Sequence, residues 1–162
     1  MNMTTKLRTR TAIVVMAAAI ALGTTACFPD VSSSSPPDPY VNAMFQAMNQ
    51  DRAQNGVPAL SYSPKLENLA GTWSWQMSSV NNLYHQDLGA ILNSPDFSAF
   101  HTLGENIIVT PPGYSPQQIE AAWMNFPPHR GNILNRGFNV VGLGHFVGPD
   151  GRVWAVADFG GL

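Results

Sequence analysis

The stretch that decides the fold lies at the end of the chain, where residues 139–159 read NVVGLGHFVGPDGRVWAVADF. Two mostly apolar runs, over residues 139–147 and 152–159, are rich in β-branched and aromatic residues. The sequence Gly-Pro-Asp-Gly at residues 148–151 joins them. This pattern predicts two antiparallel strands connected by a tight hairpin turn. A further strand is predicted over residues 105–109.

Three helices are predicted upstream of this hairpin, and each begins with a polar residue followed by proline. The starts are Asp38-Pro39, Ser63-Pro64 and Ser115-Pro116, in which the polar side chain caps the helix. Asn55-Gly56 is a stop signal for the first helix, and Pro127-Pro128 for the third. The apolar residues at helical spacing are Tyr40, Val41, Met44, Phe45 and Met48, then Leu66, Leu69, Ala70, Trp73, Met77 and Val80, then Ile119, Ala122, Trp123 and Phe126. Helices followed by an antiparallel hairpin predict an α+β layered domain.

The first 26 residues have the composition of a secretion signal. Lys6, Arg8 and Arg10 form a positively charged region, and residues 12–22 form an apolar run of 11 residues. A helix needs about 20 residues to span a bilayer, so this run is too short for a transmembrane segment. The pattern predicts a signal peptide over residues 1–26.

Cys27 is the only cysteine of the chain and follows Ala26, a small residue. A small residue before cysteine is typical of bacterial lipoprotein processing, in which the thiol is acylated and the cysteine becomes the new N-terminus. We therefore expect a lipoprotein anchored to the cell membrane through Cys27 and facing the extracytoplasmic side. The alternative is ordinary cleavage after Ala26, which gives a secreted chain with a free thiol. In either case no intramolecular disulfide forms.

The mature chain is acidic and consists of a tether and one domain. Loss of residues 1–26 leaves five basic side chains against ten acidic ones, a formal charge of −5. This balance argues against nucleic acid as a partner and against electrostatic attachment to anionic lipid. Residues 27–39 are rich in serine and proline and predict a flexible tether. Residues 40–162 are long enough for a single core.

Polar residues that could bind a metal or act in catalysis are few, and they lie at the junctions between predicted elements. His85 follows the second predicted helix, Glu105 begins a strand, and His129 follows the third helix. Two histidines and one carboxylate are a sufficient ligand set for zinc with one position open to water. Spacing alone does not link the three residues, and a capping or packing role is the alternative for each. His101 is an outside candidate for the same cleft, whereas His145 is predicted to be a structural strand residue.

Several short motifs occur in a characteristic order. They are Asn49–Gly56 with the form Asn-x-x-Arg-x-x-x-Gly, Gly104-Glu105-Asn106-Ile107, Trp123-Met124-Asn125, His129-Arg130-Gly131-Asn132-Ile133-Leu134, residues 140–144 and residues 156–160. Together they resemble the CAP superfamily, also called SCP-like proteins, which includes cysteine-rich secretory proteins, antigen 5 and pathogenesis-related proteins. The resemblance runs from about Tyr40 to Gly160, and the short, cysteine-free domain resembles the bacterial branch.

This resemblance implies a three-layer α-β-α sandwich with a small, mostly antiparallel sheet and a central cleft. In many members two histidines and two glutamates line the cleft and hold a divalent metal. By motif, His85, Glu105 and His129 match three of these four residues, while Phe126 stands where the second glutamate would fall. Zinc or another divalent metal is therefore expected at His85, Glu105 and His129, with one anionic ligand fewer than in those members.

The leading hypothesis is a binding module, an anchored CAP domain that holds either a small apolar ligand, such as a lipid or a sterol, or a component of the cell envelope. Four aromatic residues are candidates for lining its groove: Trp75, Tyr84, Phe126 and Trp154. One alternative is a zinc-dependent envelope hydrolase, in which the metal activates water and Asp158 or His101 acts as general base. The chain has no Gly-x-Ser-x-Gly, His-Glu-x-x-His or phosphate-binding glycine loop, and no catalytic residue is assigned. The other alternative is a structural protein with a vestigial cleft.

Overall fold

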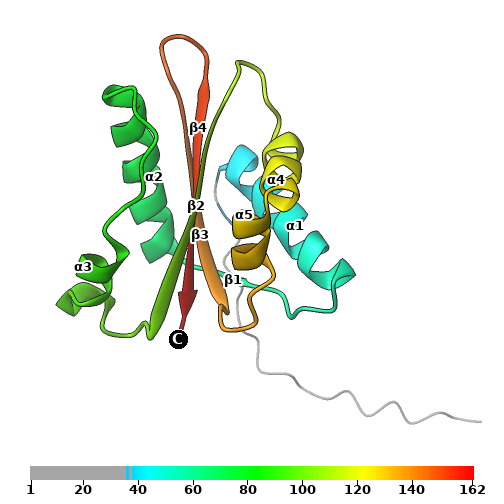
Figure 1. Ribbon diagram of the computed structural model, residues 1–162, viewed down its shortest axis with the longest axis vertical. Coiled ribbons are helices and arrows are strands. Elements are labelled where there is room, and N and C mark those ends of the chain that lie inside the picture. The colour runs from blue at the N-terminus through cyan, green and yellow to red at the C-terminus, as the bar shows by residue number, and fades with distance from the viewer. Residues whose placement is uncertain (1–35, 37) are drawn as a thin grey trace, which may run out of the picture. The chain divides into compact units, whose positions relative to one another are not determined.

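The computed structural model describes Pro36 and residues 38–162, whose arrangement can be followed in Figure 1. The predicted signal peptide, Cys27 and nearly all of the predicted tether lie outside this part of the chain, so those assignments stay predictions. Within the described part, no helix combines the length and the apolar character that a bilayer span requires.

Helices and strands alternate irregularly along the described chain. In order they are α1 (Pro39–Gln54), β1 (Ser61–Tyr62), α2 (Pro64–Ser79), α3 (Leu88–Leu92), the 3-10 helix η1 (Pro95–Phe97), β2 (Thr102–Thr110), α4 (Pro116–Asn125), α5 (Pro127–Ile133), β3 (Val140–Val147) and β4 (Val153–Gly161). The three predicted helices and three predicted strands are present. The short elements β1, α3, η1 and α5 carry no strong periodicity and were not predicted.

The strands form one sheet with the order β1-β3-β4-β2. β3 and β4 make the predicted antiparallel hairpin, and β2 pairs antiparallel with the other side of β4. β1 contributes two residues that run parallel to the start of β3. The α+β class and the mostly antiparallel sheet are confirmed. β2 is an edge strand of this sheet, which leaves one side of it open to the loop that follows α2.

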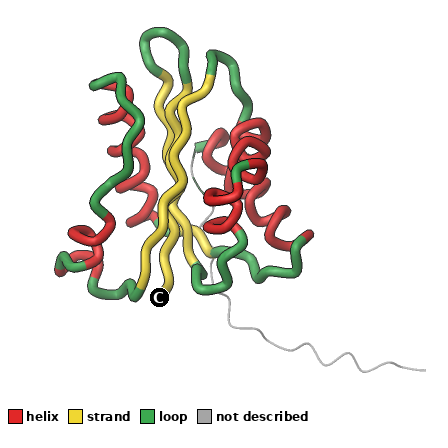
Figure 2. Tube along the Cα trace, in the orientation of Figure 1, coloured by secondary structure: helices red, strands yellow, loops and turns green. Residues whose placement is uncertain are grey.

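Helices cover both faces of the sheet, as Figures 1 and 2 show. α2 packs on β3 and β4, while α1, α4 and α5 pack on the opposite face. Two glycines let α2 lie directly against β3: a Cβ atom on Gly142 would be 2.0 Å from the Glu67 nitrogen, and one on Gly144 would be 2.3 Å from the Gly71 nitrogen. No side chain fits at either position. The expected three-layer α-β-α sandwich is confirmed.

The helix starts follow the capping rules that predicted them. The Asp38 carboxylate accepts hydrogen bonds from the backbone nitrogens of Tyr40 and Val41, at 2.7 and 3.0 Å. Ser115 and Gln118 form a reciprocal capping box at the start of α4. α1 ends as predicted, because Gly56 adopts the left-handed conformation, with φ of 66°.

The residues Asn49 and Arg52 of the first motif have structural roles. Arg52 is buried, and its guanidinium donates to the backbone oxygens of Pro58, Ile133, Asn135 and Phe138 at 2.7 to 3.1 Å. Asn49 exchanges two hydrogen bonds with the backbone of Leu60. These contacts fasten α1 to the segments that precede β1 and β3, so the motif encodes part of the fold.

The prediction of buried apolar stripes is wrong at two positions, which are exposed instead. Val80 is 56% exposed and Phe126 is 51% exposed. Both lie one residue past the end of a helix, α2 and α4 respectively, so helical periodicity no longer sets their direction. Pro127 also does more than end α4, because it occupies the first position of α5, where its missing N–H group is not needed.

Candidate functional site

The candidate site begins at the edge strand β2. Glu105 pairs in register with Asp158 of the neighbouring strand β4, which places the two residues side by side. Both are buried, and the Glu105 side chain is 1% exposed. A buried carboxylate is costly unless charged or polar groups surround it, so its partners define the site.

His85 is the first of these partners and comes from the segment after α2. Its Nδ1 atom lies 2.5 Å from Glu105 Oε1, and the backbone nitrogen of Gln86 donates to the same oxygen at 3.2 Å. The His85 side chain is nevertheless 59% exposed. When Nδ1 donates its hydrogen to the carboxylate, the neutral ring keeps its lone pair on Nε2. Glu105 thus holds a largely exposed imidazole in one orientation.

Gln86 is the second partner, and sequence reasoning missed it. Its side-chain nitrogen donates to Glu105 Oε2 at 2.7 Å and approaches both oxygens of Asp158 at 3.1 Å. The side chain therefore bridges two buried carboxyl groups. Its position next to His85 was the only indication in the sequence. Because glutamine is ordinarily a surface residue, Gln86 was not predicted to belong to the site.

The surroundings of Asp158 raise the pKa of its carboxyl group. Burial raises the pKa of Asp158 well above its usual range, the nearby Glu105 carboxylate raises it further, and the hydrogen bond from Gln86 lowers it in part. Two adjacent buried carboxyl groups do not both ionise easily, so Asp158 favours its neutral form. A neutral, 1% exposed acid is unsuited to the role of general base considered for it in a hydrolase.

His129 enters the same region from α5. The side chain of Asn106 donates to the His129 backbone oxygen at 3.0 Å, and Asn132 donates to the Glu105 backbone oxygen at 3.1 Å. Asn132 also donates to the Asn106 side-chain oxygen at 2.9 Å. These two asparagines, missed as individual residues although their motifs were quoted, tie α5 to β2.

The His129 ring packs edge-on against Phe126, with the ring centroids 4.8 Å apart. Burial lowers the pKa of His129, and the charge of His85 lowers it further. A charge on His85 therefore disfavours protonation of His129. Phe126 lies beside His129, and half of its surface is exposed to solvent.

The other polar and aromatic candidates are not part of the site. His101 is exposed at the start of β2, and its backbone nitrogen bonds to Gly161. His145 stacks on Tyr40 with centroids 4.3 Å apart, as expected for a structural residue. The four aromatic groove candidates do not line one groove. Trp154 and Tyr84 pack in the same core cluster as Trp73, whereas Trp75 is 55% exposed.

A metal at His85, Glu105 and His129 does not fit the present side-chain arrangement. Among residues 36 and 38–162, no group of three or more histidine, cysteine, aspartate or glutamate side chains is placed to hold a metal ion. Both oxygens of Glu105 already accept hydrogen bonds, one from His85 itself. Zinc binding would require these bonds to rearrange, so zinc at this site stays a prediction.

The comparison with protein families agrees with the fold and the motifs. Residues 45–159 match the model of CAP, the cysteine-rich secretory protein family. The chain therefore belongs to the CAP family. The uncharacterized protein YkwD of Bacillus subtilis (strain 168) is 28% identical over 134 residues, which cover 76% of this chain and 48% of that protein. The chain thus spans about half the length of this relative.

Two solved structures with the same fold come from bacteria. An outer surface protein from Borrelia burgdorferi has a TM-score of 0.64 and 19% sequence identity, covering 73% of this chain and 89% of that one. An extracellular protein containing a SCP domain from Bacillus anthracis str. Ames has a TM-score of 0.60 and 23% identity, covering 80% and 45% of the two chains. At these identities the likeness concerns the fold.

Proposed function

We propose that this chain is an exported, membrane-anchored CAP domain that binds a polar component of the cell envelope through His85. The observation that carries the proposal is the exposed imidazole of His85 held by a buried carboxylate, with Nδ1 of His85 2.5 Å from Oε1 of Glu105. A ring fixed in this way loses little conformational entropy when it bonds to a ligand. Relatives named as outer-surface and extracellular proteins support the location.

The hydrogen bonds that hold His85 and Glu105 in place are well suited to ligand recognition. Glu105 accepts from His85, from the Gln86 backbone and from the Gln86 side chain, so it cannot shift without breaking several hydrogen bonds. His129 adds a second imidazole whose pKa is lowered, and Phe126 adds an exposed ring. Two hydrogen-bonding rings beside an aromatic face are a pattern that suits sugars and peptides better than a lipid chain.

A polar envelope component is favoured over the apolar ligand also considered. An apolar ligand needs a pocket lined mainly by hydrophobic side chains. The aromatic residues expected to line such a groove do not form one, because Trp154 and Tyr84 pack in the core and Trp75 is exposed on α2. A polar ligand requires hydrogen-bonding groups, and the exposed imidazole of His85 supplies one.

A sedimentation assay tests this proposal. The mature chain carrying Cys27→Ser is mixed either with insoluble peptidoglycan or with vesicles of phosphatidylcholine and sterol. We expect it to sediment with peptidoglycan, and we expect His85→Ala to weaken this binding about tenfold, as for the loss of one central contact. His101→Ala is the matched control and should bind normally. Sedimentation with the vesicles alone, or equal binding by the His85→Ala chain, would contradict the proposal.

A hydrolase is the second candidate, because the same hydrogen bond leaves Nε2 of His85 able to accept a proton. Within the described residues, no serine or threonine side chain hydrogen-bonds to His85, so water would be the nucleophile. Release of soluble fragments from peptidoglycan by the wild type, and its loss in Glu105→Gln, would favour this candidate over simple binding.

A further inference from the structure

A third buried carboxyl group, besides those of Glu105 and Asp158, lies on α4, in the helix layer opposite α2. Glu120 is 2% exposed, and neither of its carboxyl oxygens has a hydrogen-bond partner among the described residues. Nearly all buried polar groups in folded proteins are partnered, so an unpartnered carboxyl is an exception that calls for a ligand or a proton. Burial and the neighbouring Asp51 raise the pKa of Glu120 to about 8.

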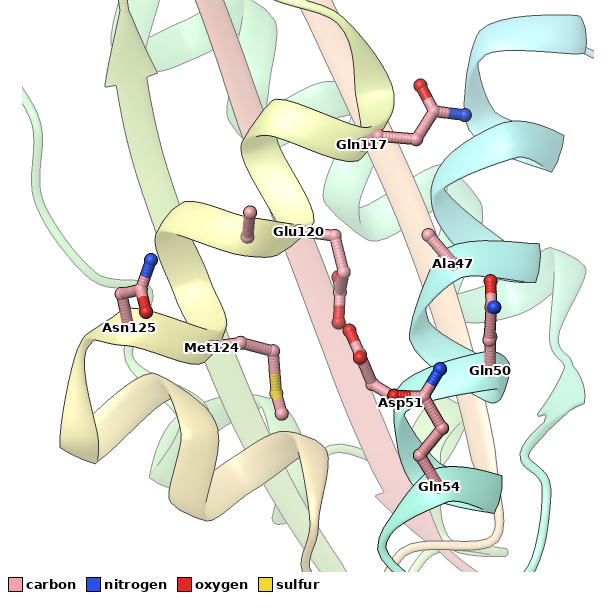
Figure 3. Close-up of a pocket in the computed structure, with 9 residues that line it drawn as sticks. Ala47, Gln50, Asp51, Gln54, Gln117, Glu120, Met124 and Asn125 are labelled. Carbon is pink, nitrogen blue, oxygen red and sulfur yellow. The ribbon is translucent and has the colours of Figure 1, made fainter.

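Asp51 reaches toward Glu120 from α1. Figure 3 shows the two carboxyl groups pointing toward each other across the space between the helices. Asp51 is partly exposed, and both residues line a groove of about 380 Å³. Glu120 therefore has a path to solvent past Asp51, although its own oxygens are covered.

The basic side chains of the surrounding elements do not neutralise Glu120. Arg52 of α1 is committed to backbone oxygens, and Arg130 of α5 donates to Asn55 at 3.0 Å. Arg130 lowers the pKa of Asp51, while burial raises it more. Glu120 thus meets one carboxyl group and no cation supplied by the described residues.

The rest of the groove offers oxygen donors. Its other lining residues are Ala47, Gln50, Gln54, Gln117, Ala121, Met124 and Asn125. Four of these carry side-chain amides, whose oxygens bind hard cations together with carboxylates. The lining includes no imidazole and no thiolate, the ligands that zinc prefers. Calcium accepts six to eight oxygen ligands in flexible geometry, and the groove has room for water ligands beside the side chains.

We propose that Asp51 and Glu120 form a binding site for a divalent cation of the calcium type in the groove between α1 and α4. The cation would partner both Glu120 oxygens and remove the repulsion between the two carboxylates. It would also bridge two helices that pack against each other on the same face of the sheet. This site is separate from His85 and does not depend on the function proposed for it.

Calorimetric titration of calcium chloride into the mature Cys27→Ser chain tests the site, together with thermal unfolding at a hundredfold excess over the measured Kd. We expect one bound ion per chain and a rise in Tm of roughly 5 °C or more. Asp51→Asn and Glu120→Gln keep the side-chain shapes and should each weaken binding about tenfold, because affinity follows ligand charge. His85→Ala should bind calcium normally.

Two results would overturn the proposal. Absence of both binding heat and a Tm shift in the wild type would show that Asp51 and Glu120 only share a proton, whatever the variants do. Calcium binding that persists unchanged in both Asp51→Asn and Glu120→Gln would place the ion elsewhere.

Discussion

The two buried glutamates of this domain, Glu105 and Glu120, have opposite surroundings. Glu105 lies on β2 and receives hydrogen bonds from His85 and Gln86. Glu120 lies on α4 with both oxygens unpartnered, and it faces a second carboxyl group, that of Asp51. Both side chains are almost inaccessible to solvent.

This difference in hydrogen bonding suggests a different role for each carboxyl group. Hydrogen bonds from the protein hold Glu105, so in the function we propose Glu105 positions His85 and the imidazole contacts the ligand. Glu120 has no such partners, so in the cation site we propose its carboxyl group itself binds the ion. Substitutions around Glu105 and around Glu120 should therefore have different effects on stability and on binding.

The largest effect is expected from tryptophan substitutions in the two helix layers, on α4 and on α2. Trp123 on α4 is completely buried, so Trp123→Ala should lower the free energy of unfolding by about 3–5 kcal/mol. Trp73 on α2 is only half-buried and donates to the Tyr84 backbone oxygen at 2.9 Å. Trp73→Ala should therefore cost about half as much. Urea unfolding measures both changes.

Trp123→Phe is the control for this pair. The Trp123 ring nitrogen has no hydrogen-bond partner among the described residues, so phenylalanine loses volume but no bond. A cost for Trp73→Ala equal to or larger than that for Trp123→Ala would mean that the α2 layer, not the α4 layer, dominates the stability of the core.

The next effect concerns the partners of Glu105. Gln86→Leu removes the side-chain bonds to Glu105 and Asp158 and leaves buried carboxyl groups unsatisfied, so it should cost about 2–3 kcal/mol. Gln117→Leu, at the exposed rim of the groove beside Glu120, should change stability by less than about 0.5 kcal/mol. Unfolding curves of the two variants give the comparison. Equal costs would show that Gln86 has no special role in holding Glu105.

Much of the fold could be predicted because its signals are local. Capping residues such as Asp38 and Ser115 determine helix starts, and the hairpin turn at residues 148–151 determines how β3 and β4 pair. Short elements such as α5 could not be predicted, since one turn of helix carries too little periodicity. Their formation depends on tertiary contacts, here the bonds between Asn132 and β2.

The site was predicted only where a motif named its residues. The link between His85 and Glu105 spans 20 positions and depends on the path of the loop after α2, which composition does not reveal. Gln86 and Glu120 lie outside any pattern with a known chemical role. Their importance comes from burial and from the presence or absence of partners, and both properties exist only in the folded chain.

A pH-dependent effect is expected at Glu120. Its pKa is about 8 in the folded chain against 4.5 for the ordinary group, so between these values the folded state holds a proton that the unfolded state has lost. Its contribution to stability therefore falls as pH rises from about 4.5 to about 8. Because Glu120→Gln removes this penalty, its free energy of unfolding should exceed that of the wild type by roughly 3–5 kcal/mol at pH 8.5, with little difference at pH 4.5.

The measurement is urea unfolding of both chains across this pH range in the presence of a chelator, so that a bound cation does not neutralise Glu120. Asp158 also has a raised pKa, but it is present in both chains and cancels in the difference. The neighbouring charged groups Asp51, Arg52 and Arg130 are likewise unchanged. A constant difference between the two chains at every pH would show that Glu120 titrates normally.

The smallest effect on stability is expected for Phe126→Glu. This substitution tests whether a carboxylate without a hydrogen-bond partner, like that of Glu120, creates a metal site near Glu105. Phe126 is 51% exposed, so Phe126→Glu should change the free energy of unfolding by less than about 0.5 kcal/mol. The new carboxylate would stand beside His129, whose ring now packs on Phe126. Unlike Glu105, it would have no hydrogen-bond partner built into the chain, so it would be free to bind a cation.

We therefore expect Phe126→Glu to bind zinc more tightly than the wild type in a calorimetric titration at pH 7.5. Adding His129→Ala to this variant should abolish the gain, because the new site needs the imidazole as its second ligand. A gain that survives His129→Ala would place the zinc at another group. No gain at all would show that the hydrogen bonds of Glu105 hold the region closed to metal even when a free carboxylate is supplied.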